Sequence, residues 1–171
     1  MPYNPEIHHR RSIRLPEYDY SCEGFYFVTI CVNNHKPLLG KIIDGTMHLN
    51  DAGHMVDKWY KKCAERFPDI QCMESVVMPN HFHCIWRNIG ISGEHTGSPL
   101  QQVVQWFKTM TTNEYIRGVK ECGWQTFDLR LWQRNYYEHI IRNQQSYENV
   151  RCYIIENPVH WLEDELYVRN A

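Results

Sequence analysis

The sequence lacks long apolar runs, internal repeats and low-complexity segments. No apolar run approaches the ~18 residues that a membrane span needs. The first residues, MPYNPEIHHRR, contain no apolar core of a signal peptide. These absences exclude membrane-spanning, disordered, collagen-like and coiled-coil classes of protein. We therefore expect a cytoplasmic protein with no membrane partner.

The sequence also lacks the cysteine patterns of stapled or zinc-binding domains. It has seven cysteines, an odd number, and no C-x-x-C pair. Most of them lie inside apolar runs, where a free thiol behaves as a small hydrophobic group. We therefore expect neither a disulfide framework nor a cysteine-based zinc site.

No excess of charge of one sign is present, because 18 Lys and Arg residues stand against 20 Asp and Glu residues. Nucleic-acid-binding domains are often strongly basic, but a local patch can supply the necessary field. The N-terminal segment has such a patch in Arg10, Arg11 and Arg14. Cations on an extended arm commonly contact phosphates. A solvated terminus without a function is the alternative.

What is present is the composition of one ordinary globular domain. The chain has 171 residues, of which 43% are apolar and 13% aromatic, enough to bury a core. We divide this single domain into an extended basic arm over residues 1–20, a core over 21–143, and a C-terminal helix with a tail over 144–171.

Local patterns predict alternating strands and helices. β-branched and aromatic runs predict strands, and helical spacing behind a capping residue predicts helices. In chain order we predict a strand over 25–32, a helix from Asn50 or Asp51 to Arg66, strands over 70–78 and 81–86 around a Pro79-Asn80 turn, a helix behind the capping box at 98–101, a strand within 132–141, and a helix capped by Ser146 and ended by Pro158.

This order predicts an α+β fold. Two strand–helix–strand units in series form a split βαβ, ferredoxin-like sandwich, with an antiparallel four-stranded sheet and helices on one face. The helix after residue 144 is an addition to this core. A fold of this kind determines no function by itself.

The most specific short motif is His81-Phe82-His83. Residues two apart in a strand share a face, so His81 and His83 project together. Two neighbouring imidazoles can bind one metal ion and leave the remaining coordination positions open. The alternative is a pair of ordinary histidines in a strand.

A second pair of residues, Tyr153 and Asn157, lies one helical turn apart on the last predicted helix. A phenol with a pKa near ~10 is a poor nucleophile at neutral pH, but it becomes competent when a cation polarises the electrophile. The amide oxygen of Asn157 is a donor that Mg²⁺ or Mn²⁺ accepts. The alternative is an aromatic residue at the edge of the core beside a helix-capping Asn.

The segment over 132–143 is rich in aromatic rings and hydrogen-bonding groups. Such a segment suits contact with unpaired bases and phosphates. It also suits a strand that lines the site, with His139 or Glu138 orienting a ligand. A structural role for the rings is the third interpretation.

Taken together, these motifs resemble those of the REP-associated tyrosine transposases, which belong to the His-hydrophobic-His superfamily of single-strand DNA transposases. The stretches that carry the resemblance are 10–15, 25–32, 76–83, 132–133 with 137–143, and Tyr153 followed by Asn157-Pro158. The family fold is the same split βαβ sandwich.

The resemblance implies that His81 and His83 bind a divalent metal, Mg²⁺ or Mn²⁺, and that Tyr153 is the nucleophile. Asn157 occupies the place where insertion-sequence relatives usually carry Gln as a ligand. The implied reaction is cleavage and rejoining of single-stranded DNA at palindromic hairpins through a covalent 5′-phosphotyrosine.

The implied partner is single-stranded or hairpin DNA in a bacterial cytoplasm, in association with the nucleoid. Arg10, Arg11 and Arg14 would contact the phosphates of the hairpin. Monomers and homodimers both occur among related transposases. Two alternative functions are a non-catalytic hairpin-binding protein on the same fold and a nickase of the replication or conjugation type.

Overall fold

The computed structural model of the chain describes residues 22–90 and 99–167. Its central strand is β1 (Gly24–Cys31), in which Tyr26 and Val28 are buried on one face and Phe27 and Thr29 on the other. Burial on both faces explains why this strand is an apolar run rather than an alternating one.

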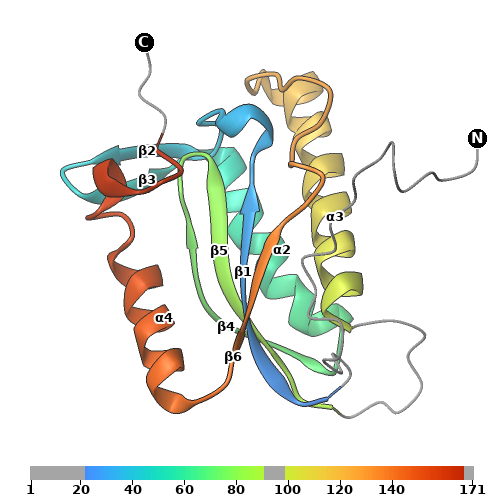
Figure 1. The fold of residues 1–171 in the computed structure, drawn as a ribbon. Coiled ribbons are helices and arrows are strands. Elements are labelled where there is room, and N and C mark those ends of the chain that lie inside the picture. Colours follow the sequence, from blue (N-terminus) through green and yellow to red (C-terminus); the bar gives the residue numbers. More distant parts are fainter. Residues whose placement is uncertain (1–21, 91–98, 168–171) are drawn as a thin grey trace, which may run out of the picture.

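Four antiparallel strands form the main sheet in the order β4-β5-β1-β6 (Figure 1). The strand β5 (His81–Asn88) pairs with β1 on one side and with β4 (Ile70–Val77) on the other. The strand β6 (Tyr137–Ile141) pairs with the opposite edge of β1. This topology confirms the predicted split βαβ arrangement.

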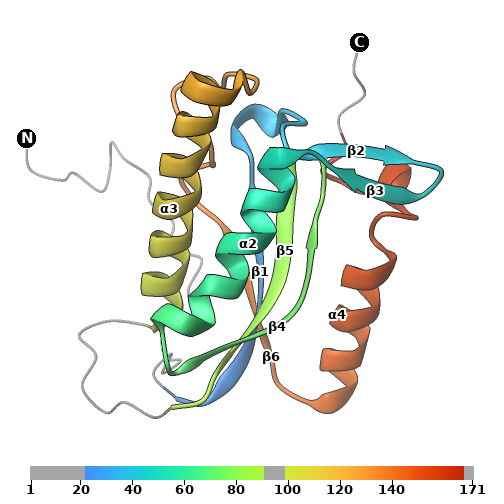
Figure 2. The same ribbon diagram turned by 180° about the vertical axis from the view of Figure 1, so that it is seen from behind.

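Two helices, α2 (Asp51–Arg66) and α3 (Pro99–Cys122), cover one face of the sheet (Figure 2). The main core lies between these helices and side chains such as Val28 and Phe82. Of the two predicted capping residues, Asn50 and Asp51, it is Asn50 that caps α2, since its side chain accepts a hydrogen bond from the backbone N–H of Gly53.

The last helix, α4 (Gln144–Glu156), lies on the other face of the sheet (Figures 1 and 2). Its residue Ile154 joins a second, smaller apolar cluster with Phe27, Ile85 and Ile141. The sheet is therefore covered by α2 and α3 on one side and by α4 on the other, which confirms the expected C-terminal addition to the ferredoxin-like core.

One local prediction was wrong, and another is confirmed over part of its range. The cap of α4 is Asn143, whose side-chain oxygen accepts a hydrogen bond from the backbone N–H of Ser146, so the helix begins two residues before Ser146. The strand predicted within 132–141 is confirmed over Tyr137–Ile141, and before Tyr137 the structure has only an isolated bridge, between Val32 and Trp132.

Four short elements complete the described chain. They are the hairpin of β2 (Gly40–Ile43) and β3 (Thr46–Leu49) and the 3₁₀ helices η1 (Asn33–His35) and η2 (Trp161–Glu163). Over residues 22–90 and 99–167, the helices do not have the length and apolarity that a membrane crossing requires.

Candidate functional site

The two predicted histidine ligands lie side by side on β5. His81 and His83 point to the α4 face of the sheet, and their ring centroids are 4.4 Å apart. Their exposed fractions are 0% and 2%. Because β5 is hydrogen-bonded on both sides, the backbone holds the two imidazoles at a fixed spacing.

Neighbouring side chains orient both rings through their Nδ1 atoms. The Nδ1 atom of His81 lies 2.8 Å from the amide oxygen of Asn80, and that of His83 lies 2.8 Å from the hydroxyl of Thr29. An Nδ1–H that donates to these oxygens leaves Nε2 with its lone pair free. Within the described part of the chain, His81 Nε2 is buried without a hydrogen-bond partner. The arrangement is that of histidines prepared to bind a metal through Nε2.

These contacts bear on the interpretation of the 132–143 segment. His139 is exposed on β6, opposite Phe27, and Thr29 takes the position beside His83 Nδ1. Neither His139 nor Glu138 therefore orients the histidine pair.

The predicted nucleophile reaches the histidines from α4. The hydroxyl of Tyr153 lies 3.4 Å from Nε2 of His83, and the side chain of Tyr153 is 45% exposed. Phe27 supports both groups, since its ring stacks on His83 at 5.3 Å and meets the Tyr153 ring edge-on at 6.0 Å. Histidine pair and tyrosine thus meet within one chain.

Asn157, the C-cap of α4, lies at the same place and is almost fully buried. Its amide nitrogen donates a hydrogen bond of 2.9 Å to Asp164, while its Oδ1 atom makes no hydrogen bond to the described residues. A buried oxygen without a partner is costly, by roughly 1–3 kcal/mol. A cation ligated by this oxygen would remove that cost.

Asp164, which directly follows η2, was not predicted from the sequence. His81, His83 and Asp164 offer ligand atoms that all lie within 4.8 Å of one another. The acidic neighbours Glu163 and Glu165 give the sequence no means of singling out Asp164, and no regular spacing links it to the histidines. The buried side chain of Trp161, whose ring centroid is 5.8 Å from that of His81, brings the segment to the site.

Burial sets the protonation of the site. Loss of solvation lowers the pKa of His81 to about 4 and holds the pKa of His83 well below its usual value. Both imidazoles are therefore neutral at pH 7, the form that ligates metals. Burial, followed by the negative charge of Asp164, raises the pKa of Tyr153 to about 12, so its phenol is protonated at neutral pH.

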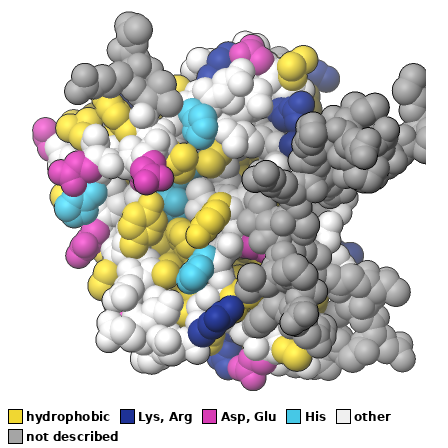
Figure 3. Space-filling model, viewed as in Figure 1, with side chains coloured by type: hydrophobic (Ala, Val, Ile, Leu, Met, Phe, Trp, Pro, Cys, Tyr) yellow, Lys and Arg dark blue, Asp and Glu magenta, His cyan; other side chains and the backbone are white. Residues whose placement is uncertain are grey.

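The surroundings of the site combine hydrophobic and histidine side chains with few charges. Figure 3 shows hydrophobic and histidine side chains gathered at the centre of this face, with acidic side chains to the left of them. Arg10, Arg11 and Arg14 lie outside the described residues.

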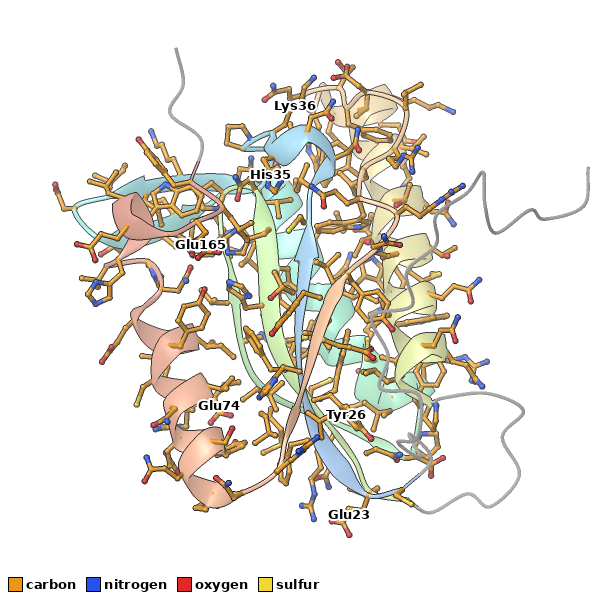
Figure 4. The ribbon with its side chains drawn as sticks, viewed as in Figure 1. Glu23, Tyr26, His35, Lys36, Glu74 and Glu165 are labelled. Atoms are coloured by element: carbon orange, nitrogen blue, oxygen red, sulfur yellow. The ribbon has the colours of Figure 1, made fainter. Side chains whose placement is uncertain are left out.

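The helix that carries Tyr153 is tied to the sheet by polar contacts as well. Glu74 of β4 lies beside α4 (Figure 4), accepts a hydrogen bond of 2.6 Å from the hydroxyl of Tyr147, and pairs with Arg151 at 3.0 Å. Tyr147 and Arg151 precede Tyr153 by six and two residues, so both contacts are formed within the two helical turns before it. They fix the position along the sheet at which α4 presents its tyrosine.

Comparison with known sequences shows two relatives in Haemophilus influenzae, while no protein-family profile matches the chain. An uncharacterised protein is 43% identical, with 97% of each chain covered. Our chain belongs to the same family as that protein. A putative REP-associated tyrosine transposase is 22% identical over 82% of our chain and 73% of its own length.

Two solved structures share the fold. A REP-associated tyrosine transposase bound to a REP hairpin is 24% identical with a TM-score of 0.57, over 86% of our chain and 74% of the other. A putative transposase from Deinococcus radiodurans R1 is 14% identical with a TM-score of 0.50, over 85% and 96% of the two chains.

Proposed function

This chain is similar to the REP-associated tyrosine transposases in its motifs, in a curated relative and in its fold, and from that premise we propose that it is a metal-dependent single-stranded DNA endonuclease and strand transferase. It would act on palindromic hairpins of the REP type through a covalent 5′-phosphotyrosine. The observation that carries the proposal is the Tyr153 hydroxyl 3.4 Å from the buried His83.

The residues present fit a divalent cation, Mg²⁺ or Mn²⁺. His81, His83 and Asp164 would hold it, and the oxygen of Asn157 would be the further ligand. The set fits because His81 Nε2 and Asn157 Oδ1 are buried atoms without hydrogen-bond partners in the described chain. Such an ion, when bound, withdraws negative charge from a phosphate oxygen.

The protein's own part in the reaction is to deliver the tyrosine oxygen. Tyr153 is half exposed, so a DNA backbone can reach its hydroxyl and the phenolic proton can leave to solvent. The tyrosine oxygen bonds to phosphorus while the bond from phosphorus to the 3′ oxygen breaks, and that oxygen takes a proton to become a free 3′-hydroxyl. The phosphodiester energy is kept in the tyrosyl bond, so rejoining needs no nucleotide cofactor.

The proposed partner is hairpin DNA with a single-stranded flank, bound in the bacterial cytoplasm at the nucleoid. Arg10, Arg11 and Arg14 would neutralise hairpin phosphates. Because Tyr153 meets the histidines of its own chain, the proposed enzyme cleaves in cis, as a monomer or within a homodimer.

The test is the covalent adduct. Tyr153→Phe removes only the attacking oxygen, so it should keep hairpin binding and form no adduct with a 5′-labelled hairpin oligonucleotide in Mn²⁺, as seen on denaturing gels. Tyr147→Phe, the same change on the same helix, should retain the adduct. Cleavage by Tyr153→Phe would show that the nucleophile is another residue. Binding without an adduct in the unaltered protein would favour a non-catalytic hairpin-binding protein.

A further inference from the structure

Tyr137 and His139 form an exposed surface that continues the candidate site. In the β1–β6 register Tyr137 lies opposite Thr29 and His139 opposite Phe27. Both therefore lie on the same sheet face as His83. Thr29 lies on β1 between Tyr137 and His83, and its hydroxyl contacts His83. On the described chain Tyr137 is 53% exposed, a large fraction for a ring in a strand of the sheet.

One ring separates this surface from the nucleophile. The ring of Phe27 lies 6.5 Å from that of Tyr137 and 6.0 Å from that of Tyr153, in both cases edge-on. In Figure 3 the hydrophobic side chains form a continuous patch around the histidines, and a basic side chain borders it below. The exposed Arg142 directly follows β6 and adds a positive charge at the end of that strand.

We propose that Tyr137 is the stacking platform for one unpaired base beside the scissile phosphate. The inference rests on the function proposed above, and it assigns to the chain a positioning residue for the DNA. When Tyr153 attacks a phosphate, the nucleotides on either side of that phosphate lie within one or two ring widths of the tyrosine oxygen. Tyr137 lies within the same range. An exposed aromatic face suits this role because every base has a π-face to stack on it.

Other occupants of the surface fit less well. Tyr137 shares its sheet face with the exposed His139, and the exposed Arg142 follows at the end of β6, so the polar groups around the ring suit a polyanion. Several acidic side chains of this face lie to the left of the histidines in Figure 3. Single-stranded DNA combines the planar groups and the negative charge that this surface favours.

The experiment separates stacking from cleavage. In a Tyr153→Phe background, the probe is a palindromic hairpin from the DNA flanking the gene, with 2-aminopurine placed in turn at each position of its single-stranded flank. We expect quenching of fluorescence on binding at one position. Adding Tyr137→Ala should abolish that quenching and weaken binding about 5- to 100-fold, and Tyr137→Phe should restore both. Ile155→Ala removes an equally exposed apolar side chain from α4 and should change neither.

An abasic nucleotide at the quenched position provides the second arm. It should weaken binding by the same factor in the parent protein and have no further effect in the Tyr137→Ala variant. Quenching that persists in the Tyr137→Ala variant would contradict the proposal that Tyr137 stacks on this base. Losses of affinity from the abasic nucleotide and from Tyr137→Ala that are independent of each other would contradict it too. Adduct formation by the unaltered protein on the same hairpins is scored separately, so a protein that forms the adduct but shows no Tyr137-dependent quenching contradicts this inference alone.

Discussion

At the scale of single residues, the site is built from groups whose hydrogen bonds leave one atom free. Asn80 and Thr29 hold the Nδ1 atoms of the two histidines, and Asp164 holds the amide nitrogen of Asn157. His81 Nε2 and Asn157 Oδ1 are thereby left without a hydrogen-bond partner in the described chain, and His83 Nε2 faces the hydroxyl of Tyr153. The buried unpartnered atoms are therefore a consequence of local hydrogen bonding and not of poor packing.

Asp164→Asn tests the ligand that the sequence did not reveal. The variant keeps the size of the side chain and removes its charge. Loss of a residue that only supports a metal ligand costs roughly 10-fold in metal affinity. Loss of a ligand should cost more, so the affinity for Mn²⁺ in a calorimetric titration should fall by more than this factor. Glu165→Gln, the same change one residue later and labelled in Figure 4, is the control and should bind Mn²⁺ normally. Equal affinities for the two variants would exclude Asp164 from the ligand set.

At the scale of secondary structure, the position of α4 decides whether Tyr153 reaches the histidines. Apolar contacts of Ile154 hold the helix against the sheet, but they do not set its position along the strands as specifically as directional bonds do. Glu74 supplies two such bonds, to Tyr147 and to Arg151. A half-buried side chain in the middle of β4 therefore helps to aim a tyrosine that lies elsewhere in the sequence.

Glu74→Ala should loosen α4 selectively. We expect amide hydrogen exchange in α4 to become roughly 10- to 100-fold faster, as for loss of a hydrogen bond to a charged group, while exchange in β5 is unchanged. Glu156→Ala removes an exposed acidic side chain of α4 that makes no hydrogen bond or ion pair to the described residues. That control should leave the exchange of both elements as it was. Uniform acceleration in α4 and β5 after Glu74→Ala would instead indicate global destabilisation.

At the scale of the whole molecule, burial of two histidines couples stability to pH. The folded pKa of His81 is about 4 and that of His83 also lies below the ordinary value of 6.5. Between these values the unfolded chain binds protons that the folded chain does not, so the free energy of unfolding falls as pH falls. The slope reaches at most about 1.4 kcal/mol per pH unit for each histidine.

Urea denaturation of the metal-free protein in EDTA between pH 7 and pH 4.5 measures this effect. We expect His81→Gln to flatten the pH dependence and His160→Gln, at an exposed histidine, to leave it unchanged. A free energy of unfolding that is independent of pH over this range in the unaltered protein would contradict neutral, buried histidines.

Much of the fold and part of the site follow from local periodicity. The strand period of two places His81 and His83 on one face, and the helical period places Tyr153 and Asn157 on one side of α4. The same periodicities predict β1, α2, β4, β5 and α3 in nearly their observed positions. The resemblance of the motifs to a transposase family added the expectation that histidines and tyrosine meet.

The sequence by itself determined which side chains could act together within each element, because a strand or helix repeats over a few residues. Only the tertiary structure decided that α4 lies on the open face of the sheet, that Asp164 completes the ligand cluster, and that Tyr137 continues the same surface. These juxtapositions join residues far apart in the chain, and they depend on how apolar faces pack rather than on any local repeat. The cap of α4 shows a limit of the local patterns too, because they predicted Ser146 and the structure has Asn143 as the cap.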